Sequence, residues 1–96
     1  MQAYTFNQRV ENLYKSYFST YENINLSLGE DQIKIYLIDK QNIDSASLEL
    51  KKLEQCHQII FWDGYSQSEV IETLNEKESA KILKRFMKKL LKILNR

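Results

Sequence analysis

The chain has 96 residues, of which 43% are hydrophobic and 28% are charged, and this composition is typical of one small globular domain. A single cysteine excludes an internal disulfide, and no apolar run approaches the roughly 20 residues that a membrane span needs. Because the N-terminal residues also lack the apolar core of a signal peptide, we expect one cytoplasmic domain over residues 1–96 that makes no membrane contact.

Charge is distributed unevenly along the sequence. Residues 1–76 contain six basic and twelve acidic residues, whereas residues 77–96 contain eight basic residues and one acidic residue. The two glycines, Gly29 and Gly64, stand far apart, so the chain has no glycine-rich phosphate-binding loop. The many Lys, Ile and Asn residues suggest AT-rich codons, and we therefore expect a mobile element, a phage or plasmid, as the source.

The first half of the chain is predicted to contain a helix followed by a β-hairpin. Large apolar and aromatic residues recur at three- and four-residue spacing over residues 5–21, which predicts a helix whose tyrosine-rich stripe lies in the core. Thr5 and Gln8 fit a capping box at its start. Residues 24–28 and 33–39 then read as two strands joined by a loop of about four residues.

A helix and a third strand are predicted next. Residues 44–55 fit a helix with Asp44 as its N-cap and with Ala46, Leu50 and Leu53 on its buried face. The apolar run at 58–63 has the length and composition of a strand. A strand, a helix and a strand at this short spacing form a βαβ unit, in which the two strands are parallel.

The C-terminal third is predicted to be helical. Ser66 with Glu69 fits a capping box for a short helix at 67–75, and Asn75 with Glu78 repeats the signal for a basic amphipathic helix at 76–96. The expected fold is a small α/β (α+β-like) domain in the order α-β-β-α-β-α-α. Its three-stranded mixed sheet, a β-hairpin plus one parallel strand from the βαβ unit, would be flanked by helices.

Few residues suggest catalytic chemistry. Asp39 and Asp63 would end adjacent parallel strands, where open α/β sheets bind ligands, and such carboxylates can hold Mg²⁺. Because Asp also commonly ends strands, we assign no metal or cofactor, and a Mg-dependent nuclease-like site stays a secondary alternative. The adjacent pair Cys56 and His57 diverges on one helix end, so we expect a half-buried thiol and a helix-end histidine. We therefore do not expect an enzyme.

Two short segments resemble known families. The segment YLIDKQNI, 36–43, resembles the first strand of PIN/NYN-type nucleases, which implies a metal-binding role for Asp39, although Lys40 stands where a small residue is usual. The segment NIDSASLELKKL, 42–53, resembles the switch segment of STAS regulatory domains, which implies Ser45 as a phosphorylated serine, although Leu48 stands where a glycine is usual. Helix capping explains both segments, and we assign the chain to neither family.

The C-terminal helix is the main functional candidate. On a helical wheel its apolar residues cover about 180°, against the roughly 100° that a surface helix needs, and nearly all the remaining residues are basic. The surplus apolar arc predicts a docked partner, either a larger protein or a second copy of the chain. The basic half predicts, as an alternative, contact with the phosphates of nucleic acid.

We therefore expect a small non-catalytic interaction or regulatory protein, an inhibitor or accessory subunit that binds a larger protein or a protein–nucleic-acid complex. A nucleic-acid-binding accessory protein is the alternative. Trp62 and Tyr65 join the helix as interface candidates, because both residue types are enriched in binding hot spots. The predicted binding residues are Lys81, Lys84, Arg85, Lys88, Lys89, Lys92, Arg96, Trp62 and Tyr65.

Overall fold

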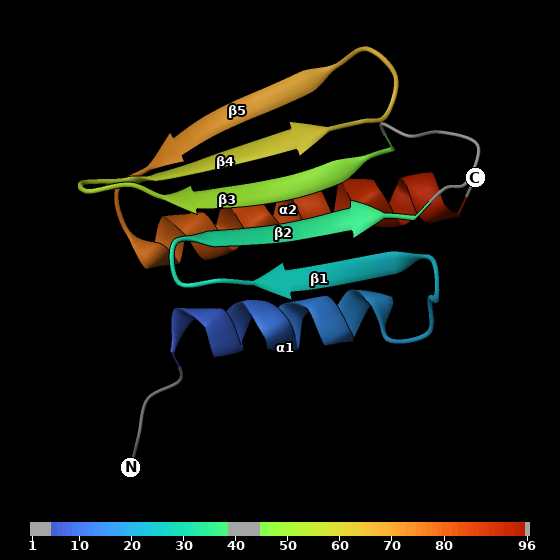
Figure 1. The fold of residues 1–96 in the computed structure, drawn as a ribbon, viewed down its shortest axis with the longest axis horizontal. Helices are drawn as coiled ribbons and strands as arrows, with labels where there is room; N and C mark the ends of the chain where they lie inside the picture. Colours follow the sequence, from blue (N-terminus) through green and yellow to red (C-terminus); the bar gives the residue numbers. More distant parts are fainter. Residues whose placement is uncertain (1–4, 39–44, 96) are drawn as a thin grey trace.

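In the part of the chain that the structure describes, five antiparallel strands and two helices make up the fold. The computed structural model describes residues 5–38 and 45–95. In chain order the elements are α1 (Phe6–Phe18), β1 (Ile24–Leu28), β2 (Gln32–Leu37), β3 (Ser47–Lys52), β4 (His57–Trp62), β5 (Ser68–Thr73) and α2 (Glu76–Leu94). The strands follow one another across the sheet in chain order, each antiparallel to its neighbour (Figure 1). The general α+β class is as expected, but the predicted three-stranded mixed sheet with a parallel strand is wrong.

The predicted helix at 44–55 is in fact strand β3. Leu48 and Leu50 are buried, whereas Lys51 is exposed and Glu49 only partly covered, and this alternation is the period of a strand. Leu53, expected on the buried face of a helix, is 49% exposed. The proposed N-cap Asp44 lies outside the described residues. Because a strand takes the place of the crossover helix, consecutive strands pair as antiparallel hairpins and no βαβ unit forms.

The predicted helix at 67–75 is strand β5. Ile71 and Thr73 point toward the core, and Val70 and Glu72 point away from it. The proposed capping box is absent as well, because the backbone N–H of Ser66 donates to the carboxylate of Asp63. The β-branched residues of this segment favour a strand, and this signal was available in the sequence.

Three local predictions are confirmed. Helix α1 begins at the expected capping box, in which Thr5 and Gln8 exchange side-chain and backbone hydrogen bonds. β1 and β2 form the expected hairpin. Helix α2 begins after Asn75, whose side-chain oxygen accepts the backbone N–H of Glu78 at 2.9 Å. The basic amphipathic helix predicted at 76–96 is therefore present, with Asn95 as its C-cap and Arg96 outside the described residues.

The core lies between one face of the sheet and the two helices. A row of aliphatic side chains crosses all five strands in register: Leu28, Ile33, Leu50, Ile59 and Ile71. A parallel row, Leu26, Ile35, Leu48 and Phe61, ends at Glu69 on the edge strand β5. The two rows therefore form an apolar surface on the inner face of the sheet, which ends at the carboxylate of Glu69 on β5.

Both helices cover this same face of the sheet. α2 lies behind the strands in Figure 1 and contacts β3, β4 and β5, whereas α1 packs beside α2 and along β1. The aromatic stripe of α1 packs in the core as expected, with Phe18 fully buried. The Tyr14 hydroxyl donates to the carbonyl of Ile24, and the Tyr21 hydroxyl donates to the side-chain oxygen of Asn95. Among the residues that the structure describes, no element covers the opposite face of the sheet.

The centre of the core supplies a stability test. Phe86 on α2 is fully buried, and its ring stacks on that of Phe61 at 5.4 Å. We expect Phe86→Ala to lower the free energy of unfolding by roughly 3–5 kcal/mol, because it leaves a large cavity. Urea unfolding would measure the loss. The control Leu74→Ala, at a side chain 79% exposed, should change it by about 0.5 kcal/mol or less; similar losses in the two variants would contradict this core.

Candidate binding surfaces

The wide apolar arc of α2 is used inside the protein. Leu83, Phe86, Met87 and Leu90 are all fully buried, and the helix contacts both the sheet and α1. A helix that packs against two neighbours at an angle to each other needs a broader apolar arc than a helix that lies on a single surface. Most of the arc that was predicted to dock on a partner is therefore used inside the protein, and only Ile82, Leu91, Ile93 and Leu94 of its large apolar side chains are partly exposed.

Glu69 pairs with two of the predicted binding residues. From the edge strand β5, its carboxylate forms ion pairs with Arg85 and, at 2.6 Å, with Lys89. The hydrogen bond from Lys89, together with the charges of Lys89 and Arg85, lowers the pKa of Glu69 despite partial burial. The Lys89 ammonium also lies 5.3 Å from the centre of the Phe61 ring. These two cations fasten α2 to the edge of the sheet.

The other lysines of α2 form a separate surface, which we call the lysine stripe: Lys77, Lys81, Lys84, Lys88 and Lys92. All five are exposed. Within residues 5–38 and 45–95, none of them makes an ion pair with a carboxylate. The stripe includes four of the predicted binding residues, and Lys77 is added to them by the structure.

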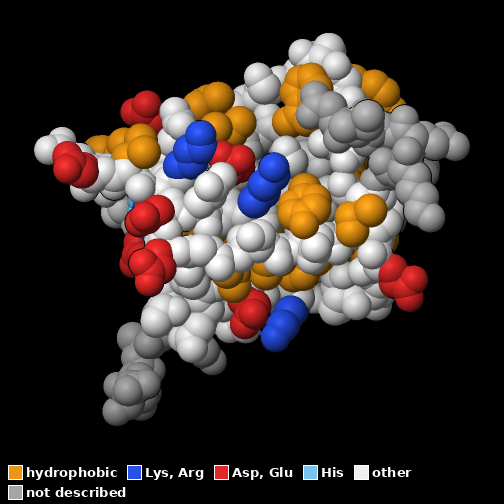
Figure 2. Space-filling model, viewed as in Figure 1, with side chains coloured by type: hydrophobic (Ala, Val, Ile, Leu, Met, Phe, Trp, Pro, Cys, Tyr) orange, Lys and Arg blue, Asp and Glu red, His pale blue; other side chains and the backbone are white. Residues whose placement is uncertain are grey.

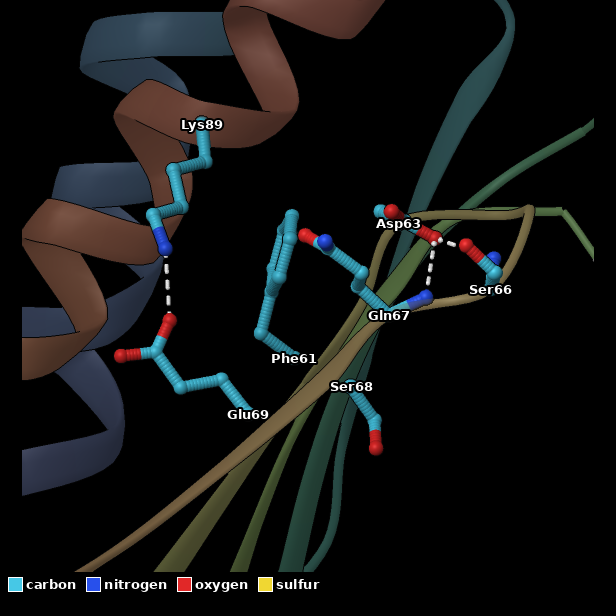
Figure 3. A pocket seen from close by; sticks show the side chains of 7 residues that line it. All are labelled: Phe61, Asp63, Ser66, Gln67, Ser68, Glu69 and Lys89. Carbon is cyan, nitrogen blue, oxygen red and sulfur yellow. Dashed lines mark hydrogen bonds and ion pairs between the residues drawn. The ribbon is translucent and has the colours of Figure 1, made fainter.

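A pocket of about 500 Å³ lies between α2 and the turn that joins β4 to β5. Figure 3 shows Lys89 and Glu69 on one side, the Phe61 ring in the middle and Gln67 with the turn on the other side. Its charged groups already have partners inside the protein, because Lys89 pairs with Glu69 and the Asp63 carboxylate accepts backbone N–H groups. The pocket therefore offers no unpaired charge to a ligand.

The carboxylate of Asp63, one half of the proposed metal pair, is engaged in the turn after β4. Asp63 accepts the backbone N–H groups of Tyr65, Ser66 and Gln67 at 2.8, 3.1 and 3.1 Å, so it holds the turn together. Gly64, at φ 91°, supplies the positive φ that this turn needs. Asp39 lies outside the described residues, and within them no three potential metal ligands cluster. The sheet is also antiparallel, so the expected edge of adjacent parallel strands does not exist.

His57 and Ser79 are connected, but not as an accessible nucleophile pair. His57 begins β4 rather than ending a helix, and its Nδ1 lies 2.8 Å from Oγ of Ser79, which is 2.5 Å from Oγ1 of Thr73. Ser79 has no exposed surface and Thr73 is 2% exposed. The network therefore joins β4 and β5 to the first turns of α2. Cys56 is half-buried as expected.

The face of the sheet opposite the helices carries a second candidate surface. Its members, which we call the open-face cluster, are Tyr36, Ile60, Trp62 and Val70. Val70 is 54% exposed and is the cross-strand partner of Ile60, while Trp62 and Tyr36 both pair with Ser47 between them. Figure 2 shows this side of the molecule, where apolar side chains are interspersed with charged ones. The sequence pointed to Trp62 but not to the other three, and Val70 was missed because β5 was read as a helix.

The remaining predicted residues lie elsewhere. Tyr65 is 75% exposed in the turn after β4, beyond the end of the open-face cluster. Ser45, implied by one resemblance as a modified serine, donates its hydroxyl to the Leu37 carbonyl at 2.6 Å and precedes a strand rather than a helix. Trp62 and Tyr65 are thus on the sheet side of the molecule, separate from the lysine stripe.

Comparison with protein-family models, curated proteins and solved structures found no match for this chain. Across the described residues, no helix is long and apolar enough to cross a membrane.

The histidine network predicts a pH dependence of stability. Burial lowers the pKa of His57, with a further lowering by Lys52 and an opposing effect of Glu76. The folded protein therefore favours the neutral ring, and its contribution is complete above the unfolded pKa of about 6.5 and is lost as the pH falls toward the folded pKa. We expect the wild type to lose more unfolding free energy between pH 7.5 and 5.5 than His57→Gln, measured by urea denaturation. Equal losses in both proteins would contradict a lowered pKa.

Proposed function

We propose that this is a small non-catalytic interaction protein that docks on a larger protein through the open-face cluster. The observation that carries the proposal is the position of Val70 and Ile60. They are cross-strand partners on the sheet face away from both helices, and Val70 is 54% exposed. A natural sheet usually places polar side chains on a face that stays in water. Apolar residues there are better explained by a face that becomes covered.

The residue types of the cluster support a protein partner. Tyr and Trp are enriched at the centres of protein interfaces, where a few residues supply most of the binding free energy. The charged side chains around the cluster are mixed in sign: Lys34, Glu49, Lys51 and Glu72. A face with two cations and two anions does not attract a polyanion, but it matches the polar rim of a protein interface.

The edge strand β5 supports docking by the face rather than by strand pairing at that edge. β5 carries Glu69, which points inward and is held by α2, and Glu72, which is exposed. Charged residues on an edge strand, inward-pointing ones especially, discourage pairing with another strand. The partner is therefore expected to cover the face of the sheet through side chains, with Ile60 and Val70 near the centre of the contact.

The non-catalytic part of the proposal rests on the state of the reactive groups. The hydroxyl of Ser79 is buried beside His57, and the carboxylate of Asp63 is engaged by three backbone N–H groups. Neither group is positioned to meet a substrate. Binding, rather than chemistry, is what the exposed residues of this chain favour.

The test compares two variants that add the same charge at similar exposure. Tagged wild type, Val70→Lys and Leu53→Lys would be used to capture partners from nuclease-treated lysate of cells that naturally express the protein. Leu53 is 49% exposed and lies in the turn after β3, away from the cluster. We expect Val70→Lys to reduce capture of the same partner by at least about tenfold, because a charge would be buried at the contact. Leu53→Lys should retain it.

Two results would overturn the proposal. Equal capture by both variants would show that the partner binds elsewhere. Analytical ultracentrifugation of the purified protein supplies the second result: a wild-type dimer that Val70→Lys converts to a monomer would mean that a second copy covers the face, not a larger protein.

A further inference from the structure

The lysine stripe has a regular geometry that the protein-docking proposal does not use. Its five positions are spaced by four, three, four and four residues, so they follow one side of α2. Fifteen residues separate the first from the last, which corresponds to about 22 Å along a helix that rises 1.5 Å per residue. The stripe is therefore a straight row of positive charge along the outer side of the helix.

The fold leaves this row uncompensated. Like charges one helical turn apart repel each other, and the described residues provide no ion pair for any of the five lysines. Arg85 and Lys89 on the same helix show the contrast, because Glu69 pairs with both. Of the described cations of α2, only these two, which face the sheet edge, form ion pairs with a carboxylate. The repulsion along the stripe would be relieved by an external anion of similar length.

The composition of the stripe distinguishes among polyanions. None of the exposed large hydrophobic side chains of the described chain belongs to α2, and a helix that binds a membrane surface needs such side chains to insert. Lysine is depleted from protein–protein interfaces, whereas interfaces with nucleic acid are far more positively charged. Lysine binds phosphate as a point charge and does not offer the fork of arginine for reading base edges.

We propose that the lysine stripe binds the phosphate backbone of nucleic acid without reading its sequence. At 3.4 Å per phosphate along one strand, 22 Å corresponds to about six phosphates. Glu76 and Glu78 flank Lys77 at the start of the helix, so the strongest contact is expected from Lys81 to Lys92. This site is on the opposite side of the sheet from the open-face cluster, and the chain would therefore join a protein to a nucleic acid.

The test uses the purified full chain and a fluorescently labelled duplex DNA of 30 base pairs, with duplex RNA as a second probe. Fluorescence anisotropy would measure affinity from low to physiological salt. Four or five phosphate contacts predict a slope of log affinity against log salt of about −3.6 to −4.5. The variant Lys84→Gln/Lys88→Gln/Lys92→Gln should reduce that slope by about 2.7 and lower affinity at least about tenfold near 0.1 M salt.

A charge-matched control separates the stripe from net charge. Lys15→Gln/Lys34→Gln/Lys51→Gln removes the same number of cations from α1 and from the open face of the sheet. It should retain wild-type affinity within about twofold and keep the wild-type salt slope. Equal losses in the two triple variants would overturn the proposal, because net charge alone would then explain binding. Circular dichroism would confirm that both variants are folded.

Further outcomes decide the class of anion. No binding of either nucleic acid by the wild type at low salt, or a salt slope near zero, would overturn the proposal without recourse to any variant. Binding to phosphatidylserine vesicles or to polyglutamate, with none to nucleic acid, would overturn it in favour of a membrane or an acidic protein. Val70→Lys should bind nucleic acid normally, so this proposal and the protein-docking proposal fail independently.

A substitution at Glu69 is expected to strengthen nucleic-acid binding, whereas the lysine substitutions weaken it. Glu69→Gln releases Arg85 and Lys89 from their ion pairs, and two more cations become available next to the stripe. We expect the salt slope to steepen by up to about 1.8 and affinity for duplex DNA to rise. Unchanged binding in a folded Glu69→Gln variant would show that the nucleic acid does not reach this side of α2.

Discussion

The packing of α2 against both the sheet and α1 is the constraint on which the other features depend. Its side chains Leu83, Phe86, Met87 and Leu90 occupy the space where the two neighbours meet. Because α1 lies along β1 and beside α2, both helices cover one face of the sheet. The other face receives no helix from the described chain, and no described element covers the lysines on the outer side of α2. Two exposed surfaces of different chemistry follow from one packing arrangement.

The sequence correctly predicted the helix starts and the hairpin, which depend on interactions between residues close together in the chain. The capping box at Thr5, the hairpin after Ile24 and the helix start at Asn75 each depend on residues within a few positions, and all three are present. The amphipathic split of the C-terminal helix was equally visible. The helical wheel could not show that two neighbours, the sheet and α1, would share the apolar arc, because α1 is distant in sequence.

The segments that became β3 and β5 were misread because their residues fit both periods. Leu, Glu and Lys in β3 favour helices, and Ala46, Leu50 and Leu53 have helical spacing, while Leu48 and Leu50 alternate as in a strand. Pairing with β2 favours the strand over the helix here, because Ile33 and Ile35 lie opposite Leu50 and Leu48 in register. Such pairing overrides intrinsic preference. The misreading also affected the candidate sites, because β3 separates β2 from β4, which were expected to be adjacent, and because Val70 on β5 was not recognised as part of the open face.

Glu69 links the stability of the sheet edge to the charge of the helix. Its carboxylate stands at the end of a core row but keeps 36% of its side-chain surface exposed, and Arg85 and Lys89 both pair with it there. Those cations are thereby held against β5. Among the described residues of α2, the exposed cations that form no ion pair with a carboxylate are the five lysines of the stripe. Because these five are all lysine, they favour contact with a uniform phosphate backbone over recognition of particular bases.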